Sequence, residues 1–190
     1  MLGAWDFNSL ECSDLLSYLI FPSIDIFLIY LNGMPYEVSI YTDGAASGNP
    51  GPGGYGVILI WGKHRKELSG GFSHTTNNRM ELKGVIEGLK ALKFDSCSVT
   101  IYSDSKYVVD AVNLGWLFDW EKKKFKKKKN EDLWIEFLRE YRKHKVKFVW
   151  VKGHNNHPEN ERCDELAVEA SHQPKLPPDS GYLVSQNNED

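Results

Sequence analysis

Residues 37–61 read EVSIYTDGAASGNPGPGGYGVILIW, and this stretch decides the fold. Its two ends have the alternation or the β-branched and aromatic content that is typical of strands. Between them, residues 42–56 contain six glycines and two prolines. A phosphate-binding loop would need GxxxxGK[ST], or GxGxxG at the start of a helix, and here a strand follows the glycines. The stretch therefore predicts a tight connection between two strands, which leaves space beside Asp43.

The chain beyond this stretch predicts a hairpin followed by alternating strands and helices. Apolar periodicity and the positions of glycine and proline set the boundaries. The predicted strands span 37–42, 55–61, 65–72, 98–103 and 145–151, and the predicted helices span 75–92, 105–116 with a break at Gly115, 131–144 and 159–170. This order predicts an α/β fold with a mixed sheet and helices packed on it.

Composition places the chain among soluble globular proteins, because 41% of its 190 residues are hydrophobic and 26% are charged. The net charge of −3 conceals an asymmetry, since residues 1–33 hold four acidic and no basic residues. Seven lysines lie within residues 122–129, and such a basic patch on a near-neutral body is typical of nucleic-acid binding. Three widely spaced cysteines predict neither a zinc site nor a disulfide framework, so we expect a cytoplasmic protein.

Residues 15–31 are the most apolar segment of the chain. They number 17, are interrupted by Pro22 and Asp25, and follow an acidic flank. A membrane helix needs about 20 apolar residues, and a signal peptide begins with basic residues. We therefore expect residues 1–33 to be an extension that the fold does not require. A segment that packs on the domain and a membrane contact are the alternatives, of which the membrane contact is less favoured.

The remaining boundaries follow from this reading. Met34 would make a natural start, so we expect the folded domain to span residues 34–173. Residues 174–190 are polar and contain several prolines, and we expect them to form a mobile C-terminal tail.

Four carboxylates lie at the ends of predicted elements. Asp43 and Asp104 each follow the carboxyl end of a strand, Glu81 lies near the start of a helix, and Asp164 lies at the opening of the last helix. Ligand sites gather outside such strand ends. Together these side chains would repel one another strongly unless cations were bound. Oxygen ligands suit Mg²⁺ or Mn²⁺, so the arrangement predicts a divalent metal site.

Four segments resemble the signature segments of ribonuclease H, bacterial type 1: TDGAASGNPGPGGYG, TTNNRMEL, YSDSKYV and VKGHNNHPENERCDELA. They occur in the family's order, and the resemblance extends over nearly all of residues 36–171. The resemblance implies a five-stranded mixed sheet flanked by helices and a monomeric enzyme without a small-molecule cofactor. It implies hydrolysis of the RNA strand of RNA–DNA hybrids with two Mg²⁺ ions, which Mn²⁺ could replace, leaving 5′-phosphate and 3′-hydroxyl ends. It also implies that His154 is the catalytic histidine of a mobile loop and that the metal ligands are Asp43, Glu81, Asp104 and Asp164.

The resemblance further implies residues that contact the hybrid or hold the site together. Short amides and hydroxyls reach 2′-hydroxyls and minor-groove edges well. The matching positions are Gly44, Asn49, Thr76, Asn77, Asn78 and Arg79. For Thr76 and Asn77, capping of the helix is an open alternative. Lys106 stands where the family commonly has a polar amide, and a lysine there could bind a phosphate instead.

Residues 115–129 occupy the place of the family's basic protrusion. Trp116 and Trp120 are spaced to anchor it on the body of the domain. We expect the lysines of this segment to neutralise phosphates of the DNA strand, beginning with Lys122, Lys123 and Lys124. A solvated charged face and a nuclear-import signal are the alternatives.

Other function classes are less well supported by the residues. A hybrid-binding module without catalysis would need an incomplete carboxylate set, and the sequence holds all four. His154 and His157 have the spacing of a zinc pair but no cysteine cluster near them, and Cys163 has no evident base partner. A nuclease recruited to a membrane or a partner through residues 1–33 stays open.

Overall fold

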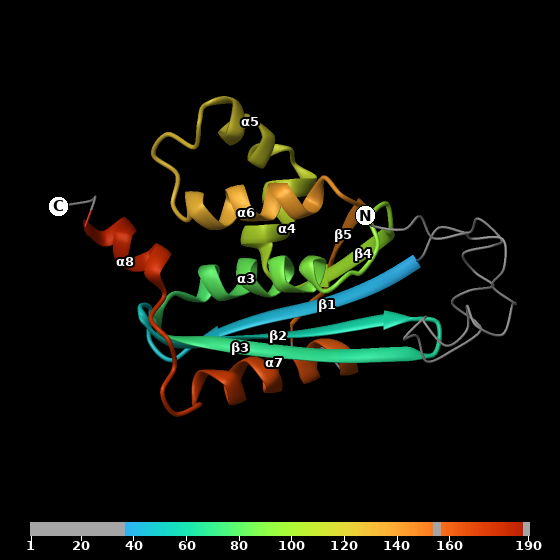
Figure 1. Ribbon diagram of the computed structural model, residues 1–190, viewed down its shortest axis with the longest axis horizontal. Coiled ribbons are helices and arrows are strands. Elements are labelled where there is room, and N and C mark those ends of the chain that lie inside the picture. The colour runs from blue at the N-terminus through green and yellow to red at the C-terminus, as the bar shows by residue number, and fades with distance from the viewer. Residues whose placement is uncertain (1–36, 154–156, 188–190) are drawn as a thin grey trace, which may run out of the picture. The chain divides into compact units, whose positions relative to one another are not determined.

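The computed structural model describes residues 37–153 and 157–187, and its centre is a five-stranded sheet of order β3-β2-β1-β4-β5 (Figure 1). The strands are β1 Glu37–Ala46, β2 Gly51–Trp61, β3 His64–Thr75, β4 Ser98–Ser103 and β5 Lys145–Trp150. β1, β2 and β3 pair antiparallel, whereas β4 runs parallel to both β1 and β5. The sheet is therefore mixed, which confirms the predicted fold class.

Helices cover both faces of the sheet. The helices are α3 Asn77–Lys90, α4 Lys106–Asn113, α5 Trp116–Lys122, α6 Glu131–Tyr141, α7 Pro158–Ser171 and α8 Ser180–Asn187. Figure 1 shows α3, α4 and α6 on one face and α7 on the other. Gly115 has a left-handed φ of 75° and separates α4 from α5, as predicted. None of the helices within residues 37–153 and 157–187 is long and apolar enough to cross a membrane, and the apolar segment 15–31 lies outside the described residues.

The glycine-rich stretch forms strand where the sequence predicted a loop. β1 continues to Ala46 and pairs with a β2 that begins at Gly51, so Asp43 lies inside β1 and not beyond its end. The reason is the close approach of α7, because a Cβ at Gly54 or Gly56 would collide with α7 backbone carbonyls. The glycines therefore permit helix–sheet packing, and only residues 47–50 connect the two strands.

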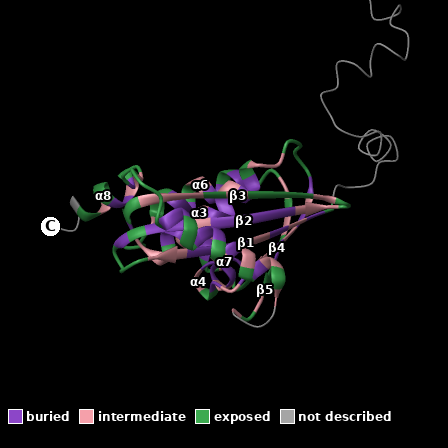
Figure 2. Ribbon diagram, turned by 90° about the horizontal axis from the view of Figure 1, so that it is seen from below, coloured by how far each residue is buried: buried purple, intermediate pink, exposed green. Residues whose placement is uncertain are grey.

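Apolar side chains fill both faces of the sheet. The larger cluster joins β1, β2, β4 and β5 to α3, α4 and α6, and includes Ile40, Ile86, Trp134 and Phe137. A smaller cluster around Ile58 packs under α7. Figure 2 shows this burial as purple along β1, β2 and α3. Burial of this apolar surface holds the helices on the sheet and fixes the elements that carry the carboxylates.

Residues 177–187 pack on the domain, beginning with a contact to β3. This differs from the mobile tail that the sequence predicted. The amide of Ser73 donates to the carbonyl of Pro177 at 2.9 Å, and α8 follows. Between them, Asp179 is buried and accepts from Arg79 Nε at 2.7 Å. Arg79 is itself only 1% exposed and also donates to Asp132 at 2.6 Å. A buried guanidinium requires acidic partners, and the tail supplies one of them.

We predict that Asp179→Ala lowers the free energy of unfolding by about 3 kcal/mol, because it leaves part of a buried guanidinium unpaired. Asp119→Ala is the matched control, since Asp119 pairs with Lys122 at the surface, where both side chains are more than half exposed. Urea unfolding followed by circular dichroism would measure both variants. Equal midpoints for the two variants would contradict the structural role of Asp179.

Candidate active site

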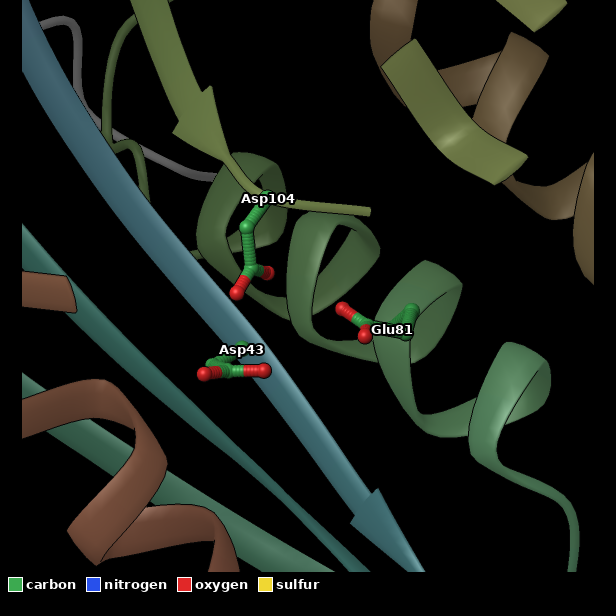
Figure 3. A group of neighbouring side chains, drawn as sticks. All are labelled: Asp43, Glu81 and Asp104. Carbon is green, nitrogen blue, oxygen red and sulfur yellow. The ribbon is translucent and has the colours of Figure 1, made fainter. Parts of the chain in front are cut away.

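Three carboxylates from separate elements meet at one place. Asp43 comes from β1, Glu81 from the N-terminal part of α3, and Asp104 from the residue after β4. One oxygen from each lies within 4.8 Å of the others. Figure 3 shows the three carboxylates pointing toward one another. The parallel pairing of β1 with β4, in which Tyr41 lies opposite Tyr102, brings Asp43 inside β1 close to Asp104 just after β4.

Glu81 reaches the cluster because α3 lies directly against β1. A Cβ at Gly44 would collide with the backbone nitrogen of Glu81, so only glycine permits this approach. The amide of Gly44 also donates to Asp43 Oδ1 at 2.7 Å. Gly44, which the family resemblance marked as a substrate contact, therefore has a structural function in the site.

Burial and mutual repulsion make the cluster electrostatically unfavourable. Asp43 is 7% exposed and Glu81 is 6% exposed. Burial, followed by the charge of Asp104, raises the pKa of Asp43 to about 7. Burial, followed by the charges of Asp43 and Asp104, raises the pKa of Glu81 well above its ordinary value. Each shift shows that the surroundings disfavour the charged carboxylate.

The same cluster has the carboxylate oxygens that a divalent ion needs as ligands. Asn77 Nδ2 donates to Glu81 Oε1 at 3.4 Å. Glu81 Oε2 is buried and has no hydrogen-bond partner among the described residues. An unpaired buried carboxylate oxygen is costly, and a cation beside it would remove both the repulsion and the missing interaction. The residues present therefore fit a divalent metal.

Of the other two predicted catalytic residues, only Asp164 belongs to the part of the chain that the structure describes. Asp164 lies in α7, is half-buried and is not among the three carboxylates whose oxygens meet. Its charge still reaches the site, because it adds to the rise in the pKa of Asp43 after burial and Asp104. His154 lies outside the described residues. His157, at the start of α7, packs against the ring of Tyr41 with 5.4 Å between ring centroids.

The polar residues at the start of α3 divide their functions. Thr76 occupies the N-cap position but makes no side-chain capping bond. Asn49 supplies the bond instead, because its Oδ1 accepts from the amide of Asn77 at 3.1 Å. Asn49, Thr76 and Asn78 line a cleft of about 1130 Å³. The side chain that caps α3 is therefore that of Asn49, in the connection between β1 and β2, and not that of Thr76. The Thr76 hydroxyl makes no capping bond and is available for other contacts.

This cleft, which we call the lysine cleft, is bounded by the start of α3, by α5, by residues 127–132 and by α8. Lys127, Lys128 and Lys129 line it together with Trp116 and Trp120. By contrast, Lys122 pairs with Asp119 at 3.0 Å. The lysines that line the cleft are therefore Lys127–Lys129 and not the predicted Lys122–Lys124.

Of the two tryptophans predicted to anchor the basic segment, Trp120 attaches it to the core. The ring of Trp120 meets Trp134 edge-on with 5.7 Å between centroids, and Trp134 is fully buried. Lys128 Nζ lies 4.7 Å from the centroid of Trp120, which holds its charge at the cleft. Trp116 is 48% exposed and lines the cleft without anchoring the segment in the core.

Trp150 is a neighbour of the site that sequence reasoning missed. Its Nε1 donates to the backbone carbonyl of Asp104 at 3.0 Å, and its ring is 44% exposed. Lys106 Nζ lies 5.3 Å from the centre of that ring. The indole thus fixes the chain at Asp104 and keeps the Lys106 charge close to the site. The strand pattern gave no sign of this, because the two residues are 46 positions apart.

The sheet order, the helix arrangement and the carboxylate cluster together define the ribonuclease H-like class of protein. The profile of the RNase H family matches residues 35–172. A protein of Rippkaea orientalis named Ribonuclease H is 54% identical over 157 residues, which are 80% of this chain and 96% of the relative. One of Desulforamulus reducens with the same name is 55% identical over 148 residues, or 75% of this chain and 92% of the relative. The chain belongs to the RNase H family.

Solved structures agree with this assignment. LC9-RNase H1, described as a type 1 RNase H with the type 2 active-site motif, has a TM-score of 0.66 and 32% identity over 72% of each chain. LC11-RNase H1, solved in complex with RNA/DNA hybrid, has a TM-score of 0.55 and 26% identity over 70% of this chain and 95% of that chain. Enzymes of this family are hydrolases that cleave the RNA strand of RNA–DNA hybrids, and the chain is one of them.

We predict that Asp43→Asn stabilises the metal-free protein at alkaline pH. The pKa of Asp43 in the folded protein, about 7, lies above the ordinary value of 3.8, so the fold favours the protonated form. The wild type therefore loses stability as pH rises from about 4 through 7, and the amide removes this loss. At pH 8 in EDTA the variant should gain about 2–4 °C in Tm for each kcal/mol of relieved repulsion.

The difference in Tm between variant and wild type, measured from pH 5 to pH 8, isolates this group from the other titrations. Asp95→Asn is the control, because Asp95 is exposed and is not one of the three carboxylates whose oxygens meet. A variant that tracks the wild type at every pH would show that the three carboxylates do not repel one another.

Proposed function

We propose that this chain hydrolyses the RNA strand of RNA–DNA hybrids with two divalent ions, Mg²⁺ or Mn²⁺, held by Asp43, Glu81, Asp104 and Asp164. The observation that carries the proposal is the cluster of three carboxylates with the unpaired, buried Glu81 Oε2. When bound, the ions would position the scissile phosphate, activate a water and stabilise the leaving oxygen. Such a reaction leaves 5′-phosphate and 3′-hydroxyl ends.

The residues of the chain prepare the site for this reaction. Gly44 fixes Asp43 through its amide, and Asn77 Nδ2 donates to one oxygen of Glu81. Figure 3 shows the Glu81 carboxylate pointing toward Asp43 and Asp104. Trp150 fixes the backbone at Asp104. His154 would move a proton at the reacting phosphate or assist release of the product.

Substrate choice would depend on the polar groups around the cluster. Neutral amides and a hydroxyl near the start of α3 suit 2′-hydroxyls, which distinguish RNA from DNA, and the lysines suit phosphates of the DNA strand. The hybrid bound in the LC11-RNase H1 structure supports this class of substrate. The residues proposed to contact the hybrid are Gly44, Asn49, Thr76, Asn77, Asn78, Lys106, Trp116, Lys122, Lys123 and Lys124.

The proposal includes the organisation of the chain. We place the catalytic domain at residues 34–173 and regard residues 1–33 as an extension outside it and 174–190 as a tail that follows it. The family profile, which covers residues 35–172, supports these limits. We expect the enzyme to act as a monomer in the cytoplasm.

Cleavage of end-labelled substrates tests the proposed activity. With Mg²⁺, the protein should cut the RNA strand of a hybrid and leave single-stranded RNA and duplex DNA intact. Asp43→Asn should abolish turnover without loss of folding, because it removes the charge of a ligand while keeping its shape. The exposed substitution Asp95→Asn should keep full turnover. Normal turnover by Asp43→Asn, or equal turnover in EDTA, would contradict the metal assignment.

Two triple variants separate the lysines of the basic segment. Alanine at Lys127, Lys128 and Lys129 should raise KM for hybrids and reduce the log–log salt slope by roughly 0.7–0.9 for each lost phosphate contact. Alanine at Lys122, Lys123 and Lys124 should have a smaller effect, since these three lie outside the residues that line the lysine cleft. KM measured from 50 to 200 mM salt would decide. Unchanged slopes in both variants would reduce the whole segment to a solvated face.

A further inference from the structure

The C-terminal helix α8 is held in a defined place beside the start of α3. Asp179 accepts from Arg79 Nε at 2.7 Å, from Thr75 Oγ1 at 2.7 Å, and from the amide of Tyr182 at 3.1 Å. Tyr182 is 8% exposed. A Cβ at Gly181 would collide with the Asp132 carboxylate, so the first turn of α8 lies against the partners of the buried guanidinium. Figure 1 shows α8 next to the N-terminal ends of α3 and α6.

Packing explains the first turn of α8 and leaves the rest of the helix without a structural function. Leu183 is 43% exposed and Val184 is 59% exposed, so the helix contributes little apolar burial beyond Tyr182. A helix of eight residues has almost no stability of its own. Its fixed position therefore depends on the Asp179 contacts, and these contacts direct the later residues of α8 to the lysine cleft.

The chemistry of the lysine cleft is that of a phosphate-binding surface. Lys127, Lys128 and Lys129 supply positive charge beside the carboxylates of Glu131 and Asp132, of which Asp132 is paired with Arg79. Asn49 and Thr76 supply neutral polar groups. α8 completes the lining with Val184, Ser185 and Gln186. The helix sequence SGYLVSQN contains no charged residue, so this wall offers the amide of Gln186 without repelling an anion, whereas the Ser185 hydroxyl donates to the carbonyl of Tyr182 at 2.7 Å. Phosphate contacts to such neutral side chains are common in nucleic-acid complexes.

We propose that α8 is a substrate-binding wall, on which Gln186 contacts the phosphate backbone of a nucleic acid that lies in the lysine cleft. The proposal rests on the proposed function for the identity of that nucleic acid, an RNA–DNA hybrid. The buried Arg79–Asp179 pair then links the substrate wall to α3, which carries Glu81 and the polar residues at its start.

Charge substitutions on α8 test this wall. Gln186→Glu should weaken hybrid binding about two- to fivefold at low salt, and Gln186→Lys should strengthen it by a similar factor, as expected for one exposed charge near a phosphate. Gln186→Lys should also steepen the log–log salt slope by roughly 0.7–0.9. Leu183→Glu and Leu183→Lys are the matched controls, because Leu183 is exposed on the same helix and does not line the cleft.

The affinity of a labelled hybrid is measured by fluorescence anisotropy in EDTA, and KM and kcat are measured separately with Mg²⁺. The proposal expects opposite shifts in Kd and KM for the two Gln186 variants, unchanged kcat and Tm, and no shift for the Leu183 pair. Equal effects at the two positions, or none at Gln186, would overturn it. If the wild type binds hybrids but does not cut them, the proposed function fails while the Gln186 contrast in Kd still decides the role of α8.

Discussion

The contact between α3 and β1 at Gly44 is the constraint on which the site depends. It lets the backbone of a helix rest on the backbone of a strand, so that Glu81 lies beside Asp43. On the opposite face, Gly54 and Gly56 let α7 approach β2 in the same way. A side chain at these positions would push the helices away from the sheet and separate the carboxylates. The glycine-rich stretch thus presents Asp43 by allowing two helices to pack closely.

This close packing buries charged side chains, and the buried carboxylates and the buried guanidinium differ in their surroundings. Asp43 and Glu81 are buried with like charges near them, and both have raised pKa values for that reason. Arg79, two residues before Glu81 in α3, is buried as well, but acidic side chains surround it. The chain therefore pairs the buried cation with opposite charges, whereas the described residues give the buried anions only neutral hydrogen-bond donors. Buried carboxylates with raised pKa values and no cationic side chain beside them are typical of a site that binds a ligand.

The sequence predicted the parts of the fold that depend on local pattern. Strand β4 has the expected bounds, and α3 and α7 lie within two residues of theirs, because each has clear periodicity. It failed where distant contacts decide the structure. The continuation of β1 and β2 through the glycines depends on α7, and the order of α8 depends on Arg79, 100 positions before Asp179. The local sequence of residues 174–190, which is polar and contains prolines, gives no sign that Asp179 will pair with a residue so distant in the chain.

The candidate site shows the same division between local and distant information. The three clustered carboxylates could be chosen from their places in predicted elements, whereas the lining of the lysine cleft could not. Which lysines of a continuous basic run face a cleft depends on the turn that follows α5, where Lys124, Phe125 and Lys127 have positive φ. This turn buries Phe125 and, with Trp120 packed on Trp134, fixes the direction of the chain. The positive charge is therefore placed by aromatic packing, and a change in that packing would alter substrate binding without changing a single lysine.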